Sequence, residues 1–305
     1  MKIKLPKYRI LEQGVTSLSE NISWAIDELG IPRNWKISMG ENVTVAVIDS
    51  GINLSHPDLK DNINTKLSLS FLNYEKNVED LNGHGTASAG IIASSKNSHG
   101  IVGVAPKSKI VAIKALGENG QGTLESFEKS LKYVWDNRES IDIVNMSLGS
   151  PQSFSSSGFS ILKKIYDYGI PLVAAAGNNP SEGILFPAKY DQVFAIGSYG
   201  PDIHKKISAF SARGEALDFV AGGERITTTY KNRCYATLEG TSFSSPLVAG
   251  IIALLISELK SKGIKITVPL IKEYLVKNSV DKGDTGWDSV YGHGKIDVSK
   301  MLVSF

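Results

Sequence analysis

The chain has 305 residues, 42% of them apolar, and its 33 Lys and Arg against 31 Asp and Glu give a formal net charge of +2. This length and composition are enough for a sizeable hydrophobic core. The balanced charge gives no electrostatic reason to expect nucleic acid or a membrane as partner. The single cysteine, Cys234, excludes an internal disulfide and fits a reducing compartment.

The N-terminal residues are charged and lack the apolar core of a signal peptide. A run of about 18 apolar residues, as a membrane-spanning helix needs, is also missing from the sequence. We therefore expect a cytoplasmic protein. Residues 1–18 are predicted to form an N-terminal extension and residues 19–305 a single domain.

Short apolar runs alternate with segments of helical periodicity along the chain. Such runs are typical of buried strands in a parallel sheet, and we predict strands at 43–48, 110–115, 141–146, 171–176 and 193–197. Helices are predicted at 84–94, 124–137, 159–168 and 246–259. This order predicts an α/β fold with a doubly wound, largely parallel sheet and helices on both faces. Functional residues should then lie at the carboxyl ends of the strands.

Four residues at the ends of these elements can carry chemistry together. Asp49 ends the first strand, His84 begins a helix of small residues, and Ser242 precedes the last helix. A serine hydroxyl becomes a strong nucleophile when an imidazole takes its proton and a carboxylate orients that imidazole. Asn178 follows another buried strand, and its amide can donate to an oxyanion. Each residue alone is equally typical of a cap or a turn.

The segments around these residues resemble the subtilase family of serine proteases. They read Val-Ile-Asp49-Ser-Gly, Gly-His84-Gly-Thr, Ala-Ala-Gly-Asn178 and Gly-Thr-Ser242, in that family's order of Asp, His and Ser. The resemblance implies a serine endopeptidase that acts on peptides or proteins. Asp49, His84 and Ser242 would be its catalytic triad, Asn178 its side-chain oxyanion donor, and residues 19–305 its catalytic domain.

The resemblance also implies a substrate cleft. Two edge strands would flank an extended peptide, as in strand addition to a sheet, and further residues would form the side-chain pockets. Leu185 could equally pack in the core. If it lines the pocket for the residue before the scissile bond, that pocket should be shallow. The implied cleft residues are Gly120, Gln121, Gly122, Leu124, Ser147, Leu148, Gly149, Ala175, Ala176, Gly177 and Leu185.

A structural calcium ion is implied at the loop of residues 94–101. Asp58 and Asn97 would supply side-chain oxygens, and Ser95, His99 and Ile101 would supply carbonyl oxygens, which are ligands that calcium prefers. The alternative is a loop without metal that its own hydrogen bonds stabilise.

The extension contains Leu5-Pro-Lys-Tyr8 and resembles the short extension of intracellular subtilisins, which lies across the cleft. An inhibitory segment is therefore expected, with a tail of no function as the alternative. The sequence departs from the family at Phe243, where methionine is usual, and at Ala87 and Ser88.

Three functions stay open at this stage. The first is intracellular protein turnover, the second a dedicated processing protease such as a leader peptidase for a modified bacterial peptide, and the third an inactive peptide-binding protein. The intact catalytic positions disfavour the third. The oligomeric state is open, with a homodimer as one option.

Overall fold

The computed structural model describes residues 2–16, 19–202, 204 and 206–299. The part of the predicted extension at residues 1, 17 and 18, and the part of the predicted domain at 203, 205 and 300–305, lie outside the described residues. The α-helices are α1 Trp24–Glu28, α2 Ile31–Asn34, α3 His84–Ala93, α4 Leu124–Asp136, α5 Ser156–Tyr168, α6 Thr241–Ser261 and α7 Val268–Lys277.

The strands fall into one large sheet and three small ones. They are β1 Lys2–Lys4, β2 Arg9–Val15, β3 Asn21–Ile22, β4 Thr44–Asp49, β5 Leu69–Ser70, β6 Ile101–Val102, β7 Lys109–Lys114, β8 Gln121–Thr123, β9 Ile143–Met146, β10 Leu172–Ala175, β11 Val193–Tyr199, β12 Phe219–Gly222, β13 Ile226–Thr229, β14 Tyr235–Glu239, β15 Ser279–Val280 and β16 Lys295–Ile296.

The large sheet has the strand order β15-β16-β12-β11-β10-β9-β4-β7-β5. Its neighbouring strands run parallel, except for the antiparallel pair β15 and β16 at one edge. The central strands are buried over nearly their whole length, as expected when helices cover both faces of a parallel sheet.

Helices cover the two faces of this sheet with two separate cores. Residues of α3, α6 and α7 pack in one hydrophobic cluster, and residues of α4 and α5 pack in the other. The helices begin where their sequences allow: Thr123 and Ser155 each accept a backbone N–H of the first turn of α4 and α5. The predicted doubly wound α/β fold with helices on both faces is therefore confirmed.

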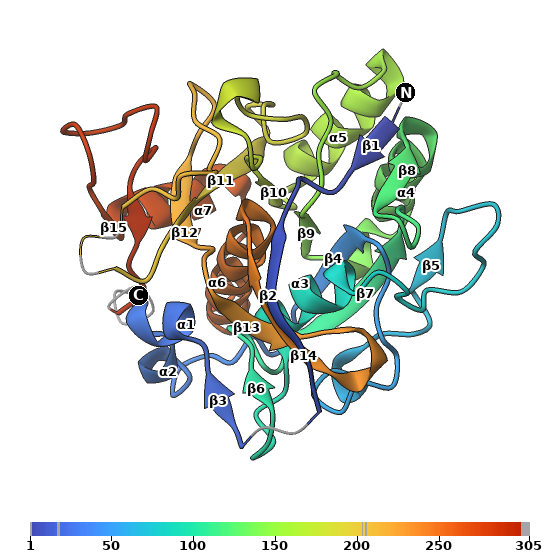
Figure 1. Cartoon of the computed structure of the whole chain (residues 1–305). Coiled ribbons are helices and arrows are strands. Elements are labelled where there is room, and N and C mark those ends of the chain that lie inside the picture. The colour runs from blue at the N-terminus through green and yellow to red at the C-terminus, as the bar shows by residue number, and fades with distance from the viewer. Residues whose placement is uncertain (1, 17–18, 203, 205, 300–305) are drawn as a thin grey trace.

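Helix α6 is apolar on every side because it lies between the sheet and α3 (Figure 1). Its length and mean hydropathy of 1.7 would be enough to cross a membrane, but the apolar window is wholly buried inside the fold. A helix that is hydrophobic all round is also what the core of a large domain requires. We therefore assign α6 to the core.

The N-terminal segment crosses the front of the molecule. In Figure 1 the dark blue chain runs from β1, beside β8, to β2, beside β14. Both pairings are antiparallel. The segment therefore pairs with β8 in one small sheet and adds a third strand to the β13–β14 pair in another, both outside the central sheet.

The predicted elements differ from the observed ones mainly at their ends. The last predicted helix starts at 246, but α6 begins at Thr241, so Ser242 lies inside its first turn. Pro246 lies in the helix and has no N–H for the carbonyl of Ser242, four residues earlier. That carbonyl accepts instead from the hydroxyl of Ser147 at 2.8 Å. A side chain thus compensates for the helix bond that proline removes.

Candidate active site

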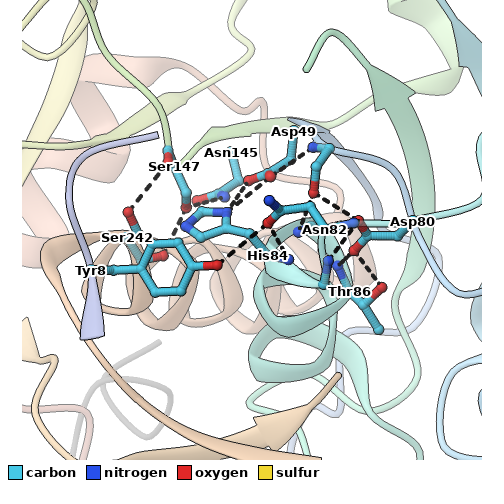
Figure 2. Close-up of polar contacts among 12 residues, drawn as sticks. Tyr8, Asp49, Asp80, Asn82, His84, Thr86, Asn145, Ser147 and Ser242 are labelled. Carbon is cyan, nitrogen blue, oxygen red and sulfur yellow. Dashed lines mark hydrogen bonds and ion pairs between the residues drawn. The ribbon is translucent and has the colours of Figure 1, made fainter. Parts of the chain in front are cut away.

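A buried carboxylate and imidazole form the centre of the site. Asp49 ends β4 and His84 begins α3, and neither side chain is exposed. His84 Nδ1 lies 2.9 Å from Asp49 Oδ1 and 3.0 Å from Oδ2 (Figure 2). This contact fixes the orientation of the ring and favours the tautomer that carries its proton on Nδ1. The other ring nitrogen, Nε2, is buried and has no hydrogen-bond partner among the described residues.

Glycines stand on both sides of His84, where other parts of the chain approach the backbone closely. Gly83 has a φ of 105°, and a Cβ atom there would lie 2.5 Å from the ring of Tyr230. At Gly85 a Cβ atom would lie 2.2 Å from the carbonyl oxygen of Gly51. Since real Cβ atoms do not approach so closely, Gly85 serves the close approach of α3 to the end of β4, and Gly83 serves the packing of the Tyr230 ring against the start of α3.

A second buried carboxylate, Asp80, holds the start of α3. Its Oδ1 accepts from the Ser50 hydroxyl at 2.9 Å and from the backbone N–H groups of Asn82 and Gly83. Its Oδ2 accepts from the N–H and the hydroxyl of Thr86, at 2.9 and 2.7 Å. Figure 2 shows Asp80 beside this first turn. A carboxylate that accepts from several backbone N–H groups at a helix start fixes that start.

Ser242 lies in the first turn of α6 with its side chain buried. Its hydroxyl donates to the carbonyl of Ser147 at 3.3 Å. Among the described residues this hydroxyl makes no hydrogen bond to His84. Ser147 also receives a bond from Asn145 Nδ2 at 3.0 Å, which ties β9 to this turn.

The Asn178 amide is held in one orientation. Its Oδ1 accepts from the N–H of Thr241 at 2.8 Å and from the Thr241 hydroxyl at 2.7 Å. Its Nδ2 is thereby turned outward and donates to the carbonyl of Lys7 at 3.1 Å. An amide fixed in this way can donate to an oxyanion without reorientation.

The N-terminal segment lies between the two strands that were predicted to flank a substrate. The N–H and the carbonyl of Lys4 both bond to Gly149, and the N–H of Leu5 donates to the carbonyl of Gly120 at 3.0 Å. Pro6 comes next and has no N–H to donate. The carbonyl that reaches Asn178 then belongs to Lys7. The segment thus lies between the strands of the predicted cleft, in the extended form expected of a bound peptide.

Tyr8 covers His84. Its ring centroid lies 4.9 Å from that of the imidazole (Figure 2). The centroid of the Phe243 ring lies 5.7 Å away. The Tyr8 hydroxyl donates to Asn82 Oδ1 at 3.4 Å. Burial above all, with further contributions from Tyr230, Asp49 and Asp80, raises the pKa of the Tyr8 phenol well above its ordinary value. The phenol therefore stays neutral, and its ring shields Nε2 of His84.

Some of the other predicted cleft residues contact this segment, and others are buried in the core. Gly120, Gln121 and Gly122 pair with it, whereas Leu148 and Ala176 are wholly buried in the core. Leu185 is 6% exposed and packs against the backbones of Gly149 and Gly177. Its side chain therefore fills the space between Gly149 and Gly177, two residues predicted to line the substrate cleft. The remaining predicted residues are Leu124, partly buried at the start of α4, and Ser147 and Ala175, which are buried.

The predicted calcium ligands meet at Asp58. Its Oδ1 lies 3.2 Å from Asn97 Nδ2 and 3.4 Å from His99 Nε2. Its Oδ2 accepts from the N–H of Ile101 and the hydroxyl of Tyr235, both at 2.9 Å. A half-turn of the Asn97 amide, whose oxygen and nitrogen are nearly interchangeable, would aim a second oxygen at the same space. In that orientation Asp58 and Asn97 would each offer one oxygen to a calcium ion.

The charge of this site would be low. Among the described residues no group of three His, Cys, Asp or Glu side chains is placed to hold a metal. Because calcium affinity rises with the number of charged ligands, a single carboxylate makes a weak site. Ser95, predicted to supply a carbonyl, donates its N–H to the carbonyl of Asp58. The ion stays a prediction.

Sequence reasoning missed three residues near the site. Asp80 precedes the start of α3, where an acidic residue is a usual helix signal. Tyr8 lies in the predicted extension, but its contact with His84 could be recognised only in the folded structure. Glu239 gave no signal, because the strand β14 that carries it was not predicted.

Comparison with known proteins gives one family. Residues 40–294 match the Subtilase family. The chain is 38% identical to Subtilisin DY of Bacillus licheniformis over 263 residues, which are 85% of this chain and 90% of that protein. It is 35% identical to Subtilisin Savinase of Lederbergia lenta, over 92% of this chain and 98% of that one.

A further relative is longer than this chain. The Minor extracellular protease Epr of Bacillus subtilis (strain 168) is 37% identical over 292 residues, which are 95% of this chain. The match spans only 43% of that protein.

Proposed function

Because the chain belongs to the subtilase family and is a subtilisin-like serine endopeptidase, we propose that Ser242 is its nucleophile, His84 its general base and Asp49 the carboxylate that orients His84. The observation that carries this proposal is the fully buried contact of Asp49 with Nδ1 of His84. It leaves Nε2 as the nitrogen that takes a proton.

In the proposed reaction the Ser242 hydroxyl turns from the carbonyl of Ser147 to Nε2 of His84. The oxygen attacks the substrate carbonyl as its proton passes to the imidazole, and Asn178 Nδ2 donates to the resulting oxyanion. His84 then gives the proton to the leaving amine, and an acyl-enzyme remains for water to hydrolyse. The bond from Asn178 to the carbonyl of Lys7 supports this role, because the amide there donates to a peptide carbonyl.

Residues 2–8 are proposed to inhibit the enzyme. The backbone bonds to Gly149 and Gly120 support this, as does the cover that Tyr8 places on His84. Pro6 has no N–H and so interrupts the run of backbone donors just before Lys7. The Ser242 hydroxyl donates to the carbonyl of Ser147 and not to His84. The segment would then be held as a peptide is held, yet without a poised nucleophile.

Labelling with a fluorophosphonate tests the nucleophile. The wild-type chain should be labelled at Ser242, and Ser242→Ala should abolish labelling. Ser244→Ala is the matched control, since this buried serine lies in the same turn and donates to the carbonyl of Ala221. Labelling that persists in Ser242→Ala would contradict the assignment.

Displacement of β1 tests the inhibition. Ile3 is fully buried, so Ile3→Asp should expel β1 from the cleft, whereas Leu11→Asp alters a residue of β2 that is 48% exposed. Burial of an isoleucine is worth about 1.5–3 kcal/mol, and burial of a charge adds a cost. We expect labelling about a hundredfold faster in Ile3→Asp and unchanged in Leu11→Asp. Equal labelling rates for Ile3→Asp and wild type would disprove inhibition.

Protein turnover in the cytoplasm is the proposed role. The processing protease stays the second candidate, favoured by Leu185, which fills space between two predicted pocket walls. Degradation of unfolded casein at many sites would support turnover, and cleavage at a few related sites in a peptide library would support processing. The location stays a prediction, and one relative is named as extracellular; cell fractionation tests it.

A further inference from the structure

Glu239 is a buried acid next to the proposed nucleophile. It ends β14, three residues before Ser242, and only 7% of it is exposed. Its carboxylate forms an ion pair with the guanidinium of Arg9, whose own side chain is 68% exposed. Apart from this ion pair, Glu239 Oε2 has no hydrogen-bond partner among the described residues. Among the described residues, the partner of this buried oxygen is therefore the Arg9 cation from the N-terminal segment.

The register gives the position of this cation relative to the reacting carbonyl. The carbonyl at Asn178 belongs to Lys7, and Arg9 follows two residues later. Arg9 is also the residue opposite Glu239 in the antiparallel pair of β2 and β14. Residues 2–9 stand in for a substrate, and the Arg9 guanidinium stands in for a substrate side chain. The corresponding substrate residue is the second after the scissile bond.

The energetics favour a basic residue there. Glu239 is 7% exposed with β2 in place. Departure of the N-terminal segment removes the Arg9 counter-ion from this partly covered carboxylate, which leaves Glu239 able to pair with a basic side chain. Lys or Arg in a substrate would replace Arg9, and Asp or Glu would be repelled. Some water enters once the cleft is empty and weakens the pair, so we expect a preference of about tenfold.

We propose that Glu239 forms an acidic subsite that selects Lys or Arg as the second residue after the scissile bond. The proposal rests on the proposed function, because it takes Lys7 to mark the position of the reacting carbonyl. It also gives Arg9 a role, since this residue would hold the inhibitory segment in the subsite that a basic substrate later occupies.

Matched peptides test this subsite. Three fluorogenic peptides differ only at the second residue after the cut, which is Arg, Ala or Glu. They are given to full-length enzyme carrying Ile3→Asp and Arg9→Ala, so that Arg9 does not occupy the subsite. The expected kcat/KM is about tenfold higher for Arg than for Ala, and lowest for Glu. Glu239→Gln should bring the Arg-to-Ala ratio close to one. Glu118→Gln, which changes an exposed acid near the cleft, should leave the ratio as it is.

Reversing the charge at position 239 distinguishes loss of the subsite from misfolding, because a misfolded variant would lose activity toward all three peptides. Glu239→Lys should prefer the Glu peptide over the Arg peptide. The subsite is disproved if Glu239→Gln keeps the full Arg-to-Ala ratio or Glu239→Lys keeps the preference for Arg. The enzyme with Glu239 intact should also cleave the Ala peptide. If it does not, the result counts against the proposed catalytic function and not against the subsite.

Discussion

Asp80 should control how well His84 is placed, and Asp80→Asn is the change that isolates this role. The side chain is 2% exposed and accepts five hydrogen bonds, three on Oδ1 and two on Oδ2. Asparagine has the same shape but only one acceptor oxygen. With its oxygen at the Oδ1 position, it loses both bonds from Thr86 and turns an NH₂ group toward the Thr86 N–H.

The expected loss follows from these bonds. A hydrogen bond to a charged group contributes about 1.5–3 kcal/mol, so two of them contribute about 3–6 kcal/mol. The neutral amide avoids the desolvation cost of a buried charge, which offsets part of this loss. We therefore expect the free energy of unfolding to fall by about 3 kcal/mol. A small shift of His84 away from Asp49 should lower kcat by about tenfold to a hundredfold.

Stability is best measured by urea unfolding in the Ser242→Ala background, which prevents self-digestion. Activity is measured in chains that keep Ser242. Asp136→Asn is the matched control, because Asp136 forms an exposed ion pair with Lys132 on α4 that should contribute about 0.3–0.5 kcal/mol. A free energy of unfolding within 1 kcal/mol of this control, together with unchanged kcat, would refute the role of Asp80.

Three further changes probe other parts of the molecule. Phe243 puts no thioether beside Ser242, so the wild type should keep its activity in mild peroxide and Phe243→Met should lose it; equal loss in both would contradict this. A calcium ion at Asp58 predicts that a chelator lowers the melting temperature of the wild type but not of Asp58→Asn, and no shift in either would argue for a metal-free loop. Leu185→Ala should enlarge the pocket and raise kcat/KM for a Phe peptide relative to an Ala peptide about tenfold; an unchanged ratio would place Leu185 in the core only.

The sequence by itself determined the architecture and the positions that carry the proposed chemistry. Buried parallel strands read as continuous apolar runs, and each predicted strand overlaps an observed one, as β4 and β11 illustrate. Asp49 and His84 each lie at an element terminus, and Asn178 lies in the loop just after β10, places that sequence patterns mark well. The reason is physical: short-range periodicity and turn residues are local properties, and a local window contains them.

Only the tertiary structure decided which distant groups meet. Tyr8 contacts His84 and Arg9 pairs with Glu239 because strands far apart in sequence lie edge to edge, and the Arg9 pair spans 230 positions. The start of α6 was also predicted too late, since Pro246 argued for a helix that begins there. The Ser147 hydroxyl, which bonds to the freed carbonyl of Ser242, comes from 95 residues away. Such long-range contacts compensate locally unfavourable residues, and no local pattern records them.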